Sequence, residues 1–237
     1  MGQGVSTQDP RDSNAEIIRQ QANTAHLREI LYNLSLEDTA QREASEAFTL
    51  TPLDLSQPTV RMAFLKSNQQ YTKFDANGYY EWSPACNEPY QKVANYCLLF
   101  AFPYKGKRFW MDDITRTRQT LGLAESWGDY RHLFIVDINP KHLFRPCLDP
   151  AVDDATCDAV RNLGHDKTHA DWYDEFFRES QQSRIPFTGL GYTYDWGLPR
   201  NDEERNRNQF SNRVVGMSEY IIKPFSPVKL VKHVFLP

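Results

Sequence analysis

From about residue 57 to its end, this chain of 237 residues alternates short apolar segments with turn residues. Short segments rich in β-branched and aromatic side chains, separated by turns, are typical of strands. The pattern predicts strands over 60–65, 96–102, 108–111, 132–138, 219–222 and 228–235. Helical segments are predicted between them, over 113–121 and 169–180. The fold class that follows is α+β, with a mixed or antiparallel sheet at its core.

The first 56 residues have a different pattern. Residues 1–13 are polar and show no apolar periodicity, which indicates a flexible N-terminus. In residues 14–34 the apolar side chains fall mostly at helical spacings of three and four, and Ser35 is a candidate N-cap for a second helix that runs to about Phe48. The sequence therefore predicts a flexible N-terminus and helical arm over 1–56, followed by an α+β domain over 57–237 that carries the candidate catalytic residues.

Two features of the sequence concern membranes. Residues 1–6 (MGQGVS) match M-G-x-x-x-[ST], the pattern for N-myristoylation of Gly2. One acyl chain without a polybasic neighbour gives only weak membrane association. No apolar run approaches the roughly 18 residues of a membrane-spanning helix, so we expect no stable insertion.

Charge and cysteine content exclude several classes of protein. The 27 Lys and Arg residues are outnumbered by 31 Asp and Glu residues, so no overall basic field favours nucleic-acid binding. The four cysteines, Cys86, Cys97, Cys147 and Cys157, form no C-x-x-C pair of the kind found in zinc sites. Cys147 and Cys157 bracket a loop and could pair under oxidising conditions, but free buried thiols are the expectation.

Residues 216–237 contain the main catalytic candidate, Glu219. It opens a short apolar strand, which a Pro-containing break separates from a second apolar strand. We interpret the two strands as a β-hairpin with a carboxylate at its mouth, where enzymes that cleave the nicotinamide–ribose bond of NAD keep their key residue. Cleavage passes through an oxocarbenium-like transition state that a nearby carboxylate stabilises. The alternative interpretation of Glu219 is a solvated residue at a strand edge.

The same chemistry needs a phosphate clamp and a surface on which nicotinamide can stack. Arg61 lies on the first predicted strand of the domain, and its planar fork is suited to a pyrophosphate. The aromatic candidates for stacking are Trp110, Tyr192, Tyr194 and Trp196.

The order of these segments resembles the ADP-ribosyltransferase-like fold of bacterial toxins and secreted effectors. The segments that carry the resemblance are TVRMAF, RFWMDDITRTRQTLG, HLFIVDINP and GMSEYIIKPFSPVKLV, within residues 57–237. The resemblance implies that Arg61 binds NAD, that Thr115 with Thr117 shapes the nicotinamide pocket, and that Glu219 is catalytic. The Ser-Thr-Ser triplet of the arginine-modifying branch is missing, and Met217 stands where that branch has the first residue of Glu-x-Glu. A single Glu fits transfer to another acceptor, or hydrolysis of NAD.

A metal site is an alternative for one histidine-rich segment. His165 and His169 are spaced i and i+4, and with Asp166 or Asp171 they could hold Zn²⁺ on one helix. The same residue types are also common at a polar helix N-terminus, which is the interpretation that we prefer. We therefore predict no metal centre.

Two other functions remain open at this point. A toxin-type, metal-independent ribonuclease could use His132, His142 or His233 with Arg and Glu for acid–base cleavage. A non-enzymatic effector module could instead bind a partner protein through the helical arm and an aromatic surface.

The sequence thus predicts an NAD-utilising toxin or effector, either a mono-ADP-ribosyltransferase or an NAD glycohydrolase. NAD would be its substrate, and an unidentified macromolecule its acceptor. The N-terminus lacks the basic and apolar regions of a standard secretory signal, so we expect delivery into a target cell by a dedicated secretion system. An immunity or chaperone protein is the expected accompanying partner.

Overall fold

The computed structural model describes residues 50–68, 72–86, 97–111, 113–123, 127–157, 167–183, 187–195 and 215–237. Most of the predicted arm, the acylation pattern at Gly2, His165 and Trp196 lie outside these residues. Among the described helices, none has the length and apolar character that crossing a membrane requires.

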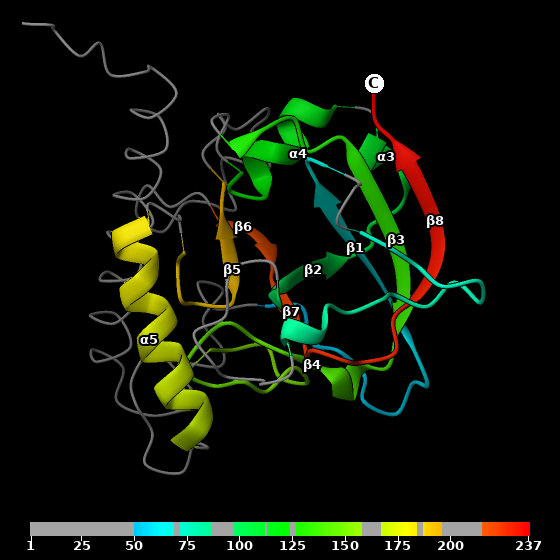
Figure 1. Ribbon diagram of the computed structural model, residues 1–237. Helices are drawn as coiled ribbons and strands as arrows, with labels where there is room; N and C mark the ends of the chain where they lie inside the picture. Colours follow the sequence, from blue (N-terminus) through cyan, green and yellow to red (C-terminus); the bar gives the residue numbers. More distant parts are fainter. Residues whose placement is uncertain are drawn as a thin grey trace, which may run out of the picture.

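The body of the protein is α+β, built around a six-stranded sheet with the order β4-β7-β2-β1-β3-β8 (Figure 1). Every pairing in this sheet is antiparallel, which confirms the predicted fold class and selects the antiparallel alternative. The strands are β1 (Val60–Lys66), β2 (Leu99–Pro103), β3 (His132–Ile138), β4 (Leu143–Phe144), β7 (Tyr220–Ile222) and β8 (Lys229–Phe235). A separate pair is formed by β5 (Tyr192–Tyr194) and β6 (Val215–Ser218).

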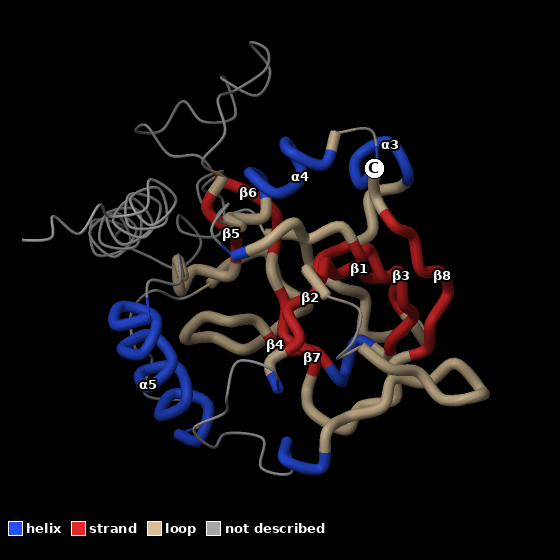
Figure 2. Tube along the Cα trace, turned by 45° about the horizontal axis from the view of Figure 1, so that its top comes forward, coloured by secondary structure: helices blue, strands red, loops and turns tan. Residues whose placement is uncertain are grey.

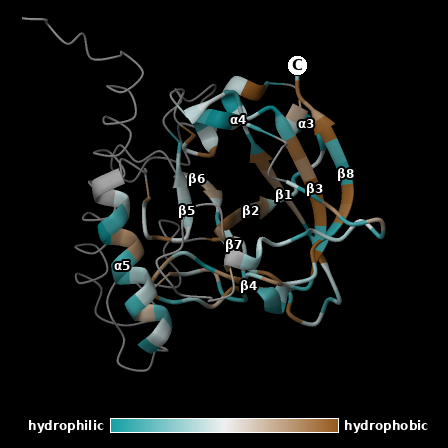
Figure 3. Cartoon of the chain, in the orientation of Figure 1, coloured by the Kyte–Doolittle hydropathy of each residue, from teal (hydrophilic) through white to brown (hydrophobic). Residues whose placement is uncertain are grey.

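The central strands are apolar on both faces, so both faces of the sheet are covered. On one face lies a cluster that we call the first cluster, which includes Met62, Phe64, Leu99, Ala101, Phe134, Val136, Tyr220 and Ile222. The opposite face carries the second cluster, which includes Ala63, Leu65, Phe102, Trp110, Leu133, Ile135 and Met217. Successive side chains along a strand point to opposite faces of the sheet, so the residues of each strand belong to the two clusters in turn. The hydropathy colouring shows apolar stretches along β1, β2 and β3 at the centre of the molecule (Figure 3).

The two C-terminal strands do not form the predicted hairpin. β7 pairs with β2 and β4, whereas β8 pairs with β3 at the far edge of the sheet. Three strands therefore separate β7 from β8 in the sheet order. The connection between them contains Pro224 and Pro227, and it crosses the end of the sheet instead of turning tightly. Glu219 consequently does not lie at the mouth of a hairpin.

The short helices agree with the sequence in part. α4 (Ile114–Thr120) begins after Asp113, whose carboxylate accepts a hydrogen bond from the Arg116 backbone N–H, as is typical of an N-cap residue. The predicted strand at 108–111 is wrong, because Lys107–Met111 forms helix α3. Since a single helical turn can bury one large residue as well as a strand can, the apolar pattern of so short a segment does not separate the two.

The longest described helix, α5 (Lys167–Ser183), lies to one side of the sheet (Figure 2). Its apolar residues Trp172, Tyr173 and Phe176 contribute to a third cluster, which also includes Phe144, Phe187 and Ile221. The predicted helix at 169–180 is therefore confirmed and longer than expected.

Residues 50–56 belong to the body of the protein and not to the arm. Leu50 and Leu53 are buried, and their backbone N–H groups donate to the carbonyls of Ala155 and Val152, each at 2.7 Å. The packed body therefore begins before the predicted boundary at residue 57.

The expectation of free thiols is wrong. Cys86 pairs with Cys97, and Cys147 pairs with Cys157. Disulfides form and persist in oxidising compartments, so this pairing is typical of a protein that is exposed to such a compartment.

Candidate functional site

Glu219 lies at the junction between β6 and β7, where the backbone is bonded on both sides. Its N–H donates to the carbonyl of Gly191 at 2.8 Å, which ties it to the segment before β5. The hydroxyl of the preceding Ser218 accepts a hydrogen bond from the Thr51 N–H at 2.8 Å, and the following Tyr220 donates its hydroxyl to the Thr51 carbonyl. The backbone that carries the candidate carboxylate is therefore held in one position.

The Glu219 side chain has an unusual environment for a carboxylate. Although part of the residue remains accessible to solvent, the packing around its carboxyl group raises its pKa from the ordinary 4.5 to about 8. Within the described residues, its carboxyl group makes no hydrogen bond or ion pair that would lower this pKa. A carboxyl group that exchanges its proton near neutral pH, without a structural partner, is a candidate acid or base.

The sheet register places Arg61 and Glu219 on the same face. Phe100 pairs with Ile221 and Ala101 with Tyr220, so the next step of the register brings Glu219 beside Phe102. Phe102 in turn pairs with Ala63, and both belong to the second cluster. Since side chains two residues apart share a face, Arg61 also lies on this side.

The separation of the two residues follows from sheet dimensions. Arg61 is two strands away from Glu219 and one two-residue step further along its own strand. With strands about 4.8 Å apart and a rise of about 3.3 Å per residue, the two Cα atoms are roughly 12 Å apart. The side chains of Ala63 and Phe102, which lie between them on this face, are buried in the second cluster.

Arg61 is oriented by an ion pair with Asp137. Its Nε donates to Asp137 Oδ1 at 2.8 Å and its Nη2 to Oδ2 at 2.9 Å, across the directly paired strands β1 and β3. The Arg61 side chain is 51% exposed, so one edge of the guanidinium remains available. The hydrogen bonds and charge of Asp137 raise the pKa of Arg61 further, and it stays cationic.

The other sequence candidates are placed differently. Trp110 is fully buried in the second cluster, between Phe102 and Phe109. Tyr192 and Tyr194 are buried in β5, with 3% and 7% exposure. The rings of all three residues therefore pack in the core. Because their faces contact other buried side chains, none of them is free to stack on a ligand. Thr115 lies exposed in α4.

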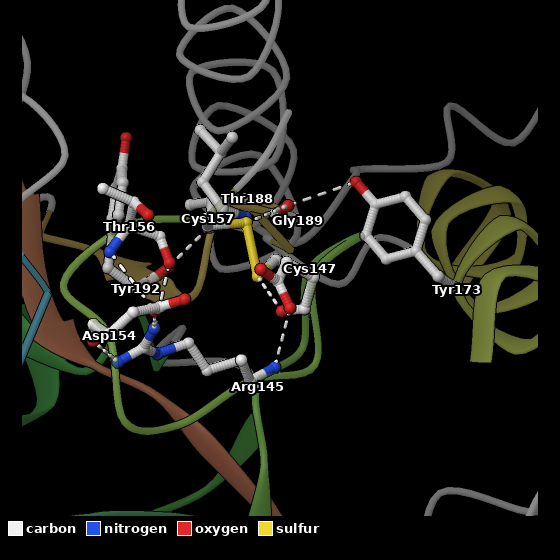
Figure 4. The surroundings of a disulfide bond; sticks show 12 residues. Arg145, Cys147, Asp154, Thr156, Cys157, Tyr173, Thr188, Gly189 and Tyr192 are labelled. Atoms are coloured by element: carbon white, nitrogen blue, oxygen red, sulfur yellow. Dashed lines mark hydrogen bonds and ion pairs between the residues drawn. A yellow bond between two sulfur atoms is a disulfide. The ribbon is translucent and has the colours of Figure 1, made fainter. Parts of the chain in front are cut away.

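Arg145, which was not a candidate from the sequence, supports the backbone near Glu219 through Thr51. Arg145 is completely buried and donates to carbonyl groups of Thr51, Asp154 and Thr156, besides its ion pair with the Asp154 carboxylate. Figure 4 shows this arginine beneath the Cys147–Cys157 disulfide. The only feature of the sequence that pointed to this arrangement was the spacing of Cys147 and Cys157, which bracket the loop.

Gly191 connects that loop to the candidate site. Its φ of +74° lies in the left-handed region, and a Cβ at this position would come within 2.9 Å of Leu50 Cδ1 and 3.3 Å of Arg145 Cδ. Only glycine therefore allows the chain to approach Arg145 this closely while its carbonyl accepts the Glu219 N–H. Thr51, Arg145 and Gly191 together position the candidate carboxylate.

The histidines separate into three places. His169 is buried, and its Nε2 lies 2.7 Å from the Cys147 carbonyl oxygen, a bond that joins α5 to the disulfide loop. His132 and His233 approach each other with Nδ1 and Nε2 at 3.1 Å. His142 ends the short 3₁₀ helix Pro140–His142, beyond the opposite end of β3 from His132. Across the described part of the chain, no three His, Cys, Asp or Glu side chains gather as a metal site would require.

Comparison of this chain with models of protein families, with curated proteins and with solved structures finds no match. An oriented, always cationic arginine shares one face of the sheet with a carboxyl group that has no partner among the described residues. That arrangement can bind an extended ligand that is anionic at one end, and it can stabilise positive charge or accept a proton at the other.

Proposed function

We propose that this protein cleaves the nicotinamide–ribose bond of NAD, as an ADP-ribosyltransferase or an NAD glycohydrolase with an ADP-ribosyltransferase-like core. The observation that carries the proposal is the position of Glu219: a carboxyl group without a hydrogen-bond partner in the described structure, with a pKa of about 8, on the same sheet face as Arg61. Local structure alone does not account for such a carboxyl group, because burying it without a partner costs stability.

The reaction follows from the two charged groups. Arg61 binds the pyrophosphate and so orients the dinucleotide. The cationic nicotinamide ribose beside Glu219 favours the carboxylate, which then stabilises the oxocarbenium-like transition state as the bond to nicotinamide breaks. Water or an acceptor attacks the ribose carbon, and its proton passes to Glu219, whose raised pKa makes it a capable base.

The proposed setting is an effector or toxin that acts in a target cell on an unidentified macromolecular acceptor. The two disulfides support passage through an oxidising compartment before the protein reaches that cell. A chaperone or immunity protein is the expected partner during synthesis or storage.

The first experiment measures nicotinamide release from NAD by the full-length protein, with and without a cell lysate. Glu219→Gln keeps the size of the side chain and removes the ionisable group, and we expect release to fall by about 100-fold or more. Glu81→Gln is the matched control. Glu81 is exposed, and its substitution makes the same chemical change away from the site.

Arg61→Lys separates binding from chemistry. Lysine keeps the positive charge but lacks the planar fork of the guanidinium group, so we expect KM for NAD to rise about tenfold with a smaller change in kcat.

The products of the reaction distinguish transfer from hydrolysis. Label transferred from NAD to a lysate component indicates a transferase, and free ADP-ribose indicates hydrolysis. A folded protein that releases no nicotinamide under either condition would refute the proposal and favour the protein-binding module.

A further inference from the structure

Three basic side chains lie on the face of the sheet that is opposite to Arg61 and Glu219. Lys66 of β1 pairs directly with His132 of β3, so both side chains lie on the same face. His233 of β8 pairs with Phe134 and stacks on its ring, with centroids 4.4 Å apart and planes at 8°. Phe134 belongs to the first cluster, which identifies the face. Three neighbouring strands thus contribute one basic side chain each.

The two imidazole rings are held in place by aromatic contacts. His132 lies 5.3 Å from His233 and 5.2 Å from Phe235, measured between ring centroids. One of the two facing nitrogens, His132 Nδ1 and His233 Nε2, donates its hydrogen to the other at 3.1 Å. Desolvation, and then the neighbouring His132, lower the pKa of His233, as expected for rings that cannot both be charged without a counter-ion.

No described carboxylate balances the charge of this cluster. In the part of the chain that the structure describes, no carboxylate pairs with Lys66, His132 or His233. Lys66 is partly buried, and this burial lowers the pKa of its ammonium group. Because buried charges in proteins are normally paired, an anion is the ligand that best suits a partly buried ammonium group on the same face as two imidazoles.

We propose that Lys66, His132 and His233 bind a phosphate group, as inorganic phosphate or a phosphomonoester. Binding would replace the single imidazole–imidazole hydrogen bond by charge-assisted bonds from both protonated rings and the ammonium to phosphate oxygens. A divalent cation fits less well, because the Lys66 ammonium would repel it and two imidazoles are an incomplete ligand set. This site is independent of the proposed NAD chemistry, since it lies on the other face of the sheet.

The test is calorimetric titration of inorganic phosphate into the full-length protein, in chloride buffer at a pH of about 6, near the ordinary histidine pKa. We expect one site, and a Kd that rises about tenfold or more in Lys66→Met, which loses one charge-assisted hydrogen bond. Lys232→Met is the matched control, because Lys232 is exposed and its partner Ile135 belongs to the opposite face. It removes the same charge and should change the Kd by less than about twofold.

A second readout covers the case in which Lys66→Met fails to fold. In the unmodified protein, phosphate should shift the imidazole proton resonances of His132 and His233 and leave those of His142 unchanged. Equal weakening by Lys232→Met, loss of binding in Arg61→Gln alone, or the absence of any phosphate effect would each overturn the proposal. Binding of Zn²⁺ without binding of phosphate would also overturn it, and would assign the histidine pair to a metal.

Discussion

Replacing Glu219 by glutamine should stabilise the protein at alkaline pH while it removes the proposed activity. In the folded state the pKa of Glu219 is about 8, against 4.5 in the unfolded chain. Between these two values the folded protein holds a proton that the unfolded chain releases, so stability falls as the pH rises from 4.5 to 8 and then levels off. The glutamine side chain of the variant does not titrate, so the variant escapes this loss.

The size of the effect follows from the shift. At about 1.4 kcal/mol per pKa unit, a rise from 4.5 to about 8 corresponds to a ceiling of about 5 kcal/mol. Glu219 is partly accessible to solvent, which screens the charged form, so we expect roughly 2–3 kcal/mol at pH values above 8 and almost none below 4.5.

Urea unfolding of both proteins across this pH range measures the difference directly, because titration of all other groups cancels between them. Glu81→Gln, which makes the same substitution at an exposed position, is the control. A Glu219→Gln curve parallel to that of the unmodified protein would falsify the reasoning, since it would mean that the carboxyl group is hydrated like an ordinary one.

Three further changes test the support around the site. Cys147→Ser with Cys157→Ser opens a loop of sequence separation 10, and loop entropy predicts a loss of about 3 kcal/mol in urea unfolding and lower nicotinamide release; unchanged release would separate the disulfide from the site. Arg145→Met leaves several partly buried carbonyl groups and the Asp154 carboxylate without this donor, so we expect a loss of about 3 kcal/mol, seen as a lower Tm. Gly216→Ala places a Cβ against the Thr193 hydroxyl and should cost about 2 kcal/mol, and normal stability would show that β6 is packed less closely than the structure indicates.

Arg61 and Glu219 became candidates from the sequence because each is a charged residue beside an apolar run, and such a position depends only on neighbouring residues. Their role in catalysis stays a prediction. The stacking residues could not be chosen in this way. Trp110 and Tyr192 have the same local pattern whether they face a ligand or the core, and the structure buries both.

The support of the site depends on contacts between distant residues. Thr51 bonds to Ser218 and Tyr220, and Arg145 reaches back to Thr51 across ninety-four positions of sequence. No local pattern predicts such pairs, because the polar groups of each residue could form hydrogen bonds with water equally well, and its neighbours in sequence do not indicate the distant partner.

What the sequence determined by itself is a part of the set of elements: the apolar runs of β1 and β3, the helix α4 with Asp113 as its N-cap, and the α+β class that follows from them. These depend on periodicity and capping, which act over a few residues. Only the tertiary structure decided which strands pair. The segments of β7 and β8 are adjacent in the chain and were predicted to form a hairpin, yet each gains more by pairing with a longer or more buried strand elsewhere in the sheet. That choice sets Glu219 on the same face as Arg61, because the burial of side chains from the whole chain outweighs the short connection between two neighbouring strands.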